Sequence, residues 1–97
     1  MKVIYMRSFL KRFHIHSKSQ QIIIHKTVEE TLKYLETGRA AYGLRIKKLH
    51  KRIYESRINI HLRLAYFKEK DIVKFFCLGD HDDIKKCLKD LKQLLKI

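Results

Sequence analysis

Two histidines and two arginines have the types and the spacing that RNA cleavage requires. Arg57, His61 and Arg63 are separated by even numbers of residues in one segment where apolar and polar residues alternate. His81 follows the next apolar segment. When RNA is cleaved by its own 2′-hydroxyl, a base removes the hydroxyl proton, an acid protonates the leaving 5′-oxygen and cations stabilise the phosphorane. Histidine suits proton transfer near neutral pH, and the arginine fork binds two phosphate oxygens. These four residues are therefore our candidate catalytic set.

A run of basic residues precedes this set. The 97-residue chain holds 23 Lys and Arg against 10 Asp and Glu, a formal net charge of +13. Such an excess favours a polyanionic partner, above all nucleic acid. No acid occurs between Glu36 and Glu55, and this interval carries the candidate RNA-binding residues Lys47, Lys48, His50, Lys51 and Arg52. A merely solvated basic surface is the alternative, and a membrane surface is a weaker one because the helices lack a broad apolar face with Trp.

The remaining residues with reactive side chains predict no metal site and no cofactor. His14 and His16 form a pair without an evident third ligand, and Asp80 and Asp83 have the spacing of a helix cap. The two cysteines, Cys77 and Cys87, have apolar neighbours, and no signal-peptide segment is evident. We therefore expect reduced core thiols in a cytoplasmic protein, with a disulfide as the alternative. The apolar runs are far too short to span a bilayer.

The first part of the chain predicts one strand and two helices. Residues 2–6 are short and apolar, which is typical of a strand. Ser8 is a candidate cap for a first helix. A one-sided apolar stripe through Ile24, Val28, Leu32 and Leu35 predicts a second helix over 20–37, which Gly38 ends.

The second part predicts three strands and a helix. Residues 44–54 form one candidate strand and 72–78 another; between them, 55–67 alternates strictly, which predicts a single long strand. The alternation in this strand predicts Arg57, His61 and Arg63 on an open face. On the other face it predicts four buried residues: Ile58, Ile60, Leu62 and Leu64. The last helix begins after Asp80, and its apolar stripe is Ile84, Leu88, Leu91 and Leu95.

These elements predict one α+β domain over residues 1–97, in the order β-α-α-β-β-β-α. Helices would cover one face of a mainly antiparallel sheet and leave the other face open and basic. We expect Arg63 and His81 to be partly exposed there, so that replacing either with Ala changes stability little.

Three short motifs resemble the RelE/ParE superfamily of toxins. Residues 43–49 (GLRIKKL) resemble its entry segment, 54–58 with 61–66 resemble its strand motifs, and 78–83 (LGDHDD) resemble an end found in some members. Their order and spacing together are fairly specific, and the expected N-terminal strand and two helices also agree, so the resemblance covers nearly the whole chain. The resemblance implies the RelE-like fold described above.

The resemblance also implies roles for single residues. Arg63 matches the strand arginine that contacts the scissile phosphate, and His81 matches a position that is Arg or His in nuclease members. Arg57 and His61 match positions where a His-rich branch places His and an acid, and Lys47 with Lys48 matches the region of basic substrate contacts. The chain departs from the family at Cys87 and Lys85, where some members carry aromatic residues.

The implied function is that of the toxin of a toxin–antitoxin pair. Such a toxin would be an endoribonuclease that cleaves mRNA, on the ribosome in many members, and its partners would be a cognate antitoxin, mRNA and the ribosome. The alternative is a toxin-fold protein without nuclease chemistry, either a gyrase-type inhibitor or a module that binds nucleic acid or protein.

Overall fold

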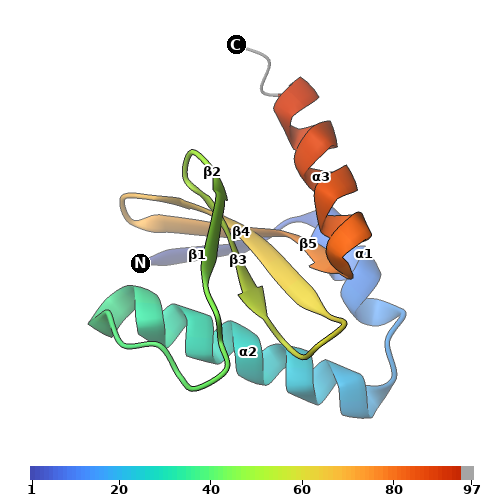
Figure 1. Cartoon of the computed structure of the whole chain (residues 1–97), viewed down its shortest axis with the longest axis horizontal. Helices are drawn as coiled ribbons and strands as arrows, with labels where there is room; N and C mark the ends of the chain where they lie inside the picture. The colour runs from blue at the N-terminus through green and yellow to red at the C-terminus, as the bar shows by residue number, and fades with distance from the viewer. Residues whose placement is uncertain (95–97) are drawn as a thin grey trace.

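A computed structural model describes residues 1–94, and the side chains of residues 1–91. Three helices surround a five-stranded sheet (Figure 1). The strands are β1 (Lys2–Tyr5), β2 (Lys47–His50), β3 (Ile53–Arg57), β4 (Arg63–Glu69) and β5 (Ile72–Gly79). The helices are α1 (Arg7–His14), α2 (Lys18–Thr37) and α3 (His81–Leu94). None of the helices in this part of the chain is long and apolar enough to cross a membrane.

The sheet has the order β1-β5-β4-β3-β2. Only β1 and β5 are parallel, and the other neighbours are antiparallel. The α+β class and the mainly antiparallel sheet are thus confirmed. The predicted element order lacked one strand, because the segment 55–67 is a hairpin of β3 and β4 and not one strand.

The β3–β4 connection explains why the strand prediction was wrong. The Asn59 side-chain oxygen accepts hydrogen bonds from the backbone N–H groups of His61 and Leu62, both at 2.9 Å, and this closes a turn without glycine or proline. The apolar residues alternate in the sequence through this turn, but they do not share one environment. Ile58 and Leu62 pack against the core, whereas Ile60 is 75% exposed. The predicted burial of Ile60 is therefore wrong, and that of Leu64 is confirmed.

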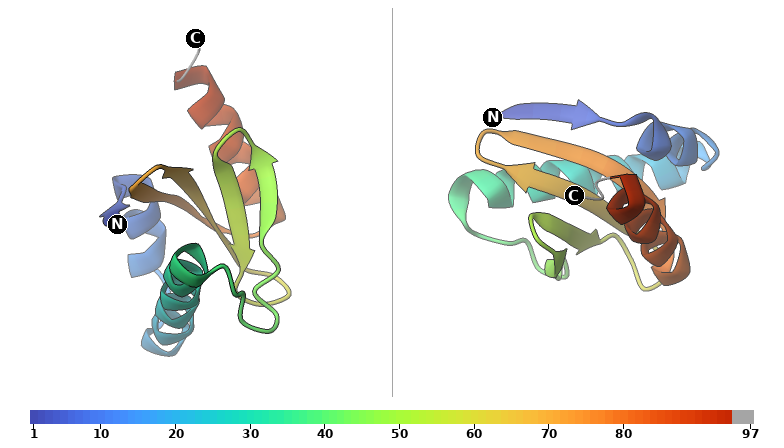
Figure 2. Two further views of the ribbon diagram at one scale, coloured as in Figure 1. Left: turned by 90° about the vertical axis from the view of Figure 1, so that its left-hand side faces the viewer. Right: turned by 90° about the horizontal axis from the view of Figure 1, so that it is seen from above.

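Helices α1 and α2 cover one face of the sheet (Figure 2). Phe9, Ile24 and Val28 from these helices pack against sheet residues that include Tyr66 and Phe75. Ser17 caps α2, accepting from the Gln20 N–H, and Gly38 ends the helix with φ 77°, as expected. Ser8 does not cap α1, whose N-cap is Met6, because its hydroxyl donates to the Phe76 carbonyl instead.

Helix α3 packs on the opposite face of the sheet. Its Ile84 is buried against Ile53, Ala65 and Phe76, and Leu88 and Leu91 are partly buried there. The expectation that all helices share one face is therefore wrong, and the second face stays open only beside α3. The position of Leu95 in the apolar stripe lies outside the described residues.

Cys77 of β5 and Cys87 of α3 form a disulfide, with their Cα atoms 6.2 Å apart. The expectation of two reduced thiols is therefore wrong, and the alternative that we left open holds. Cys77 is fully buried, as expected, and Cys87 is half-buried. The bond ties the middle of α3 to the strand on which it packs.

Candidate functional site

A cleft opens on the second face of the sheet, beside the first turn of α3. Its volume is about 330 Å³. We call it the basic cleft, and its lining residues are Arg45, Ile46, Lys47, Glu55, Arg57, Arg63 and His81. Four permanent cations and one histidine thus face a single carboxylate, so the cleft attracts anions.

The strand register brings these residues together. Lys47 lies opposite Glu55, and Arg57 lies opposite Arg63. Residues two apart on a strand share a face, which places Glu55 and Arg57 side by side. Arg63 in turn lies opposite Gly79, two residues before His81 begins α3. The cleft is therefore assembled from β2, β3, β4 and α3.

Arg63 and Glu55 form an ion pair inside the cleft. The Arg63 Nε lies 3.3 Å from a Glu55 carboxylate oxygen, and the two side chains are only 17% and 9% exposed. Because Glu55 contacts Nε, the terminal nitrogens of the Arg63 fork remain available to phosphate oxygens. The expectation that Arg63 is partly exposed is met, but its partner is a buried carboxylate.

A capping box holds the start of α3, and with it His81. The Asp83 N–H donates to the Asp80 carboxylate at 2.9 Å, and the Asp80 N–H donates to the Asp83 carboxylate at 3.0 Å, as the sequence predicted. This backbone hydrogen bond, together with Arg12 at 3.3 Å, lowers the pKa of Asp83. His81 itself is exposed at the mouth of the cleft.

Gly79 permits the close approach of α3 to β5. A Cβ atom at this position would lie 2.5 Å from the Asp83 Cβ, which is closer than real contacts allow. Any larger residue at position 79 would push the first turn of α3 outward. His81, which belongs to that turn, would move with it.

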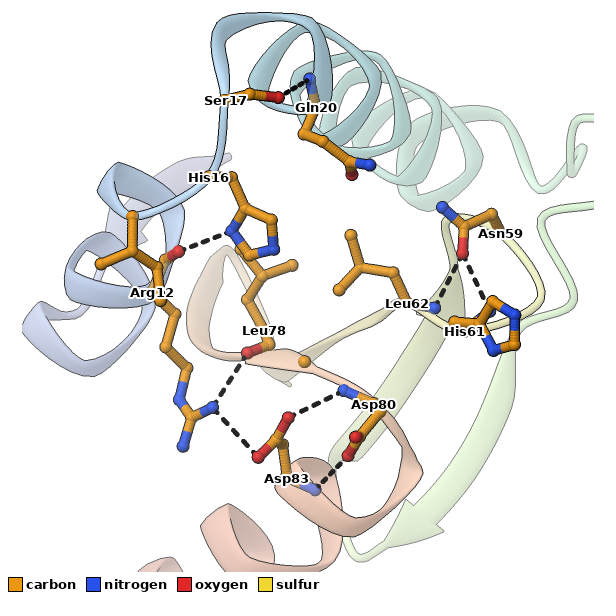
Figure 3. A pocket seen from close by; sticks show the side chains of 12 residues that line it. Arg12, His16, Ser17, Gln20, Asn59, His61, Leu62, Leu78, Asp80 and Asp83 are labelled. Carbon is orange, nitrogen blue, oxygen red and sulfur yellow. Dashed lines mark hydrogen bonds and ion pairs between the residues drawn. The ribbon is translucent and has the colours of Figure 1, made fainter.

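His61 lies outside the basic cleft. It belongs to the β3–β4 turn and lines a separate hollow of about 580 Å³, together with Arg12, His16, Asn59 and Asp80 (Figure 3). The prediction that His61 shares an open face with Arg57 and Arg63 is therefore wrong. The cause is the turn at Asn59, which ends β3 before the alternating pattern reaches His61.

The candidate RNA-binding residues are also divided. Lys47 lines the cleft, whereas its neighbour Lys48 is exposed and, by strand alternation, points to the opposite side of the sheet. His50, Lys51 and Arg52 lie at the β2–β3 turn, and Arg52 pairs with Glu69 at 2.8 Å. Of the nine predicted site residues, Lys47, Arg57, Arg63 and His81 meet in one cleft.

Sequence reasoning missed two cleft residues, Arg45 and Glu55. The sequence could have pointed to Glu55, because it is the one acid between Glu36 and Glu69. It is also separated by even numbers of residues from Arg57 and Arg63, so the alternating pattern puts it on their face. Arg45 adopts a left-handed backbone with φ 42° just before β2, and nothing in the sequence pattern predicts that turn.

Comparisons with known proteins show which solved structures share this architecture. No family model matches the chain. No curated protein matches it either. Solved structures do match. The DinJ–YafQ toxin–antitoxin complex of E. coli contains a chain with a TM-score of 0.66 and 14% identity, which covers 84% of this chain and 92% of its own.

Two further structures agree. The YoeB dimer from Staphylococcus aureus has a TM-score of 0.65 and 19% identity over 84% of this chain and 97% of its own. The YoeB/ParE toxin from Agrobacterium tumefaciens has a TM-score of 0.64 and 15% identity over 84% and 99%. The chain has the RelE/ParE toxin fold. The fold that the resemblance implied is thereby confirmed, and in this fold the basic cleft lies on the sheet face that carries α3.

Proposed function

We propose that this protein is the toxin of a toxin–antitoxin pair and an endoribonuclease that cleaves mRNA. The observation that carries the proposal is the basic cleft, which Arg57, Arg63, Glu55 and His81 line together. The toxin part of the proposal is supported by the fold, because the solved structures with this fold are described as toxins.

The cleft supplies what an attack by the 2′-hydroxyl needs. Arg63, oriented through its Nε by Glu55, holds the scissile phosphate with its terminal nitrogens, and Arg57 on the adjacent strand adds a second cation. Both arginines face the negative charge that develops on the phosphorane. Their neighbours Arg45 and Lys47 hold the adjoining phosphates.

Two groups in the cleft can exchange protons with the substrate. Glu55 is the single carboxylate of the lining, and it would remove the 2′-hydroxyl proton. His81 stands exposed at the mouth and would protonate the leaving 5′-oxygen. The products would be a 2′,3′-cyclic phosphate and a 5′-hydroxyl end. Glu55 thus replaces His61 of the predicted catalytic set as the counterpart of His81 in proton transfer, since His61 lines the other hollow.

The partners follow from charge. A net charge of +13 favours polyanions such as ribosomal RNA and mRNA, and we propose that the protein cleaves mRNA on the ribosome, in the cytoplasm. We also propose an antitoxin whose acidic segment covers the basic cleft. Neighbours of this fold have been solved as complexes described as DinJ–YafQ and YoeB–YefM.

A rival function has one observation in its favour. No Phe, Tyr or Trp lines the described cleft, so a substrate base would have only the His81 imidazole on which to stack. A toxin-fold protein that binds RNA or a protein without cleaving anything would tolerate this. The two functions differ in whether His81, the exposed proton donor, is needed for activity.

Primer extension on mRNA after induced expression, with and without ribosomes, tests the proposal. Wild type, Arg57→Ala, His81→Ala and Lys48→Ala are compared at matched soluble levels. New 5′ ends from wild type and Lys48→Ala, but not from the other two, are expected. Growth arrest by all four without any new mRNA ends would establish the rival function.

A further inference from the structure

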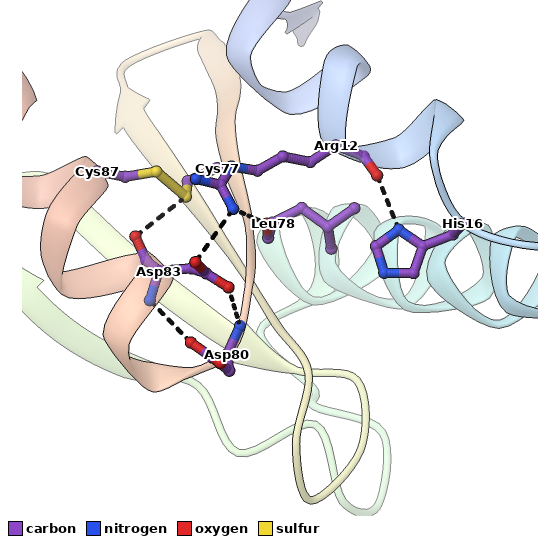
Figure 4. Close-up of polar contacts among 7 residues, drawn as sticks. All are labelled: Arg12, His16, Cys77, Leu78, Asp80, Asp83 and Cys87. Atoms are coloured by element: carbon purple, nitrogen blue, oxygen red, sulfur yellow. Dashed lines mark hydrogen bonds and ion pairs between the residues drawn. A yellow bond between two sulfur atoms is a disulfide. The ribbon is translucent and has the colours of Figure 1, made fainter.

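The disulfide between Cys77 and Cys87 joins β5 to α3, the helix that begins at the cleft residue His81. Figure 4 shows the bond beside the capping box of α3. Cys77 is in the strand that precedes His81, and Cys87 is six residues after it, about 9 Å along the helix at 1.5 Å per residue. The same short helix therefore carries the proton donor of the cleft and one half of a bond that can be made and broken.

We propose that this disulfide is a reversible redox latch that fixes α3, and with it His81, against the sheet. In the oxidised protein the helix is tied covalently to β5 and His81 is held beside Arg63. In the reduced protein the helix depends on weaker contacts, so His81 is less well positioned. The latch itself is independent of the proposed function, and only its effect on RNA cleavage rests on that function.

The other attachments of α3 are few. Among the described side chains of α3, only that of Ile84 is fully buried, and Leu88 and Leu91 are half-buried. At the first turn, the Arg12–Asp83 pair is 33% and 40% exposed, and pairs so exposed stabilise little. Beyond these contacts the helix extends away from the sheet (Figure 1). Elements with few buried contacts open locally with little free energy, so a covalent tie changes their opening strongly.

The site also suits the reduced state. The Cys77 Sγ lies 3.7 Å from the Asp83 carbonyl oxygen. A disulfide sulfur has no proton to donate, whereas a thiol has one. Reduction therefore gives the buried Cys77 a hydrogen-bond acceptor in place, and the pocket can hold either redox form of this residue.

The exchange reaction needs a dithiol reductant of the kind that maintains the cytoplasmic thiol pool. A thiolate of the reductant attacks Cys87, the more exposed sulfur, which forms a mixed disulfide and releases Cys77 as a thiolate that takes up a proton. The second thiol of the reductant then attacks the mixed disulfide and frees Cys87. The reductant leaves as its own disulfide, so two electrons and two protons pass to the protein.

The test uses the full chain in an oxidised and a reduced form. Alkylation followed by intact mass measurement counts free thiols after treatment with oxidised glutathione or dithiothreitol. Amide hydrogen exchange then follows residues 84–91 in both forms. We expect no thiols and slow exchange after oxidation, and two thiols and at least roughly tenfold faster exchange after reduction. Cys87→Ser, a change at a half-buried position, should exchange fast under both conditions.

Each outcome decides a separate point. Two alkylated thiols under oxidising conditions, or equal exchange in both forms of the wild type, would overturn the latch. Unequal exchange with equal RNA cleavage would overturn its coupling to His81. If neither form cleaves RNA, the proposed function fails, and the exchange rates still decide the latch.

Discussion

The Nε of Arg63 lies 3.3 Å from the Glu55 carboxylate, and the two side chains are only 17% and 9% exposed. The residue that we assign to phosphate binding is thus also half of a largely buried ion pair. Our expectation that replacing Arg63 changes stability little is therefore revised: its removal would leave a carboxylate desolvated without its partner.

Arg63→Met should lower the free energy of unfolding by about 3 kcal/mol, because a buried charge that loses its partner keeps its desolvation cost. Urea unfolding at pH 7 measures the effect. The double variant Arg63→Met, Glu55→Gln should recover part of the loss, since it removes the uncompensated charge. Additive losses in the double variant would show that the two side chains do not interact in solution.

His81→Ala should slow RNA cleavage by ~100- to 10,000-fold, the usual contribution of a positioned proton donor. Because the side chain is exposed, its unfolding free energy should change by less than about 0.5 kcal/mol. His61→Ala is the matched control, since His61 lines the other hollow, and it should cleave at nearly the wild-type rate. The reverse ranking would return the catalytic role to His61.

Lys47→Ala should weaken RNA binding and reduce the dependence of affinity on salt by about one phosphate contact. Its neighbour Lys48 carries the same charge on the other side of the sheet, so Lys48→Ala should change the salt slope much less. Fluorescence anisotropy with a short RNA across a salt series distinguishes them. Equal slopes for the two variants would mean that RNA does not enter the cleft.

Asp83 should stabilise the fold in a pH-dependent manner. Its pKa is lowered below the ordinary value of 3.8 by the Asp80 N–H and by Arg12, so the contribution is fully present above about pH 4 and is lost as the pH falls through the lowered pKa. Asp83→Asn should melt at a lower temperature than wild type at pH 6, and this difference should shrink at pH 2.5. Asp82→Asn in the same helical turn is the control, and a similar pH-dependent loss there would refute the assignment.

Tyr66→Phe should leave the protein as stable as wild type or more stable, by up to about 1 kcal/mol, because the buried Tyr66 hydroxyl makes no hydrogen bond of regular geometry in the described part of the chain. The nearby Ser56 hydroxyl offsets only part of the effect of burial on the Tyr66 pKa. Burial also raises the pKa of Tyr66 from 10.0 to about 12. The unfolded chain therefore ionises first, and the stability of the wild type should fall between pH 10 and pH 12. The variant should lack this part of the decline, whereas the fully exposed Tyr42→Phe should retain it.

Sequence patterns predicted the elements whose signals are local. The stripe through Ile24 and Val28 located α2 to within two residues, and Gly38 marked its end, because a helix that covers a sheet must repeat its apolar residues at helical spacing. The capping box of Asp80 and Asp83 was predictable for the same reason, since both partners lie within one turn.

The site was predicted only in part, because it depends on contacts between distant segments. Arg57 and Arg63 were placed correctly on one face, yet for the wrong reason, since they lie opposite each other in a hairpin and not along one strand. His61 lies in the turn, where the alternation of side chains between the two faces of a strand no longer applies. The pairing of Cys77 with Cys87 depends on how α3 docks, which spacing alone does not determine.

The pairing of β1 with β5 means that the sheet, and the cleft on it, can form only late in synthesis. Lys2 lies opposite Ile72, so β1 cannot pair until β5, which is synthesised later, is available. Until β5 has emerged, Arg63 lacks its neighbour Gly79, and His81 has not yet been joined to the chain. A nascent chain of this topology cannot form its cleft while the sheet is incomplete, so under the proposed function it would not cleave RNA before β5 and the start of α3 have been synthesised.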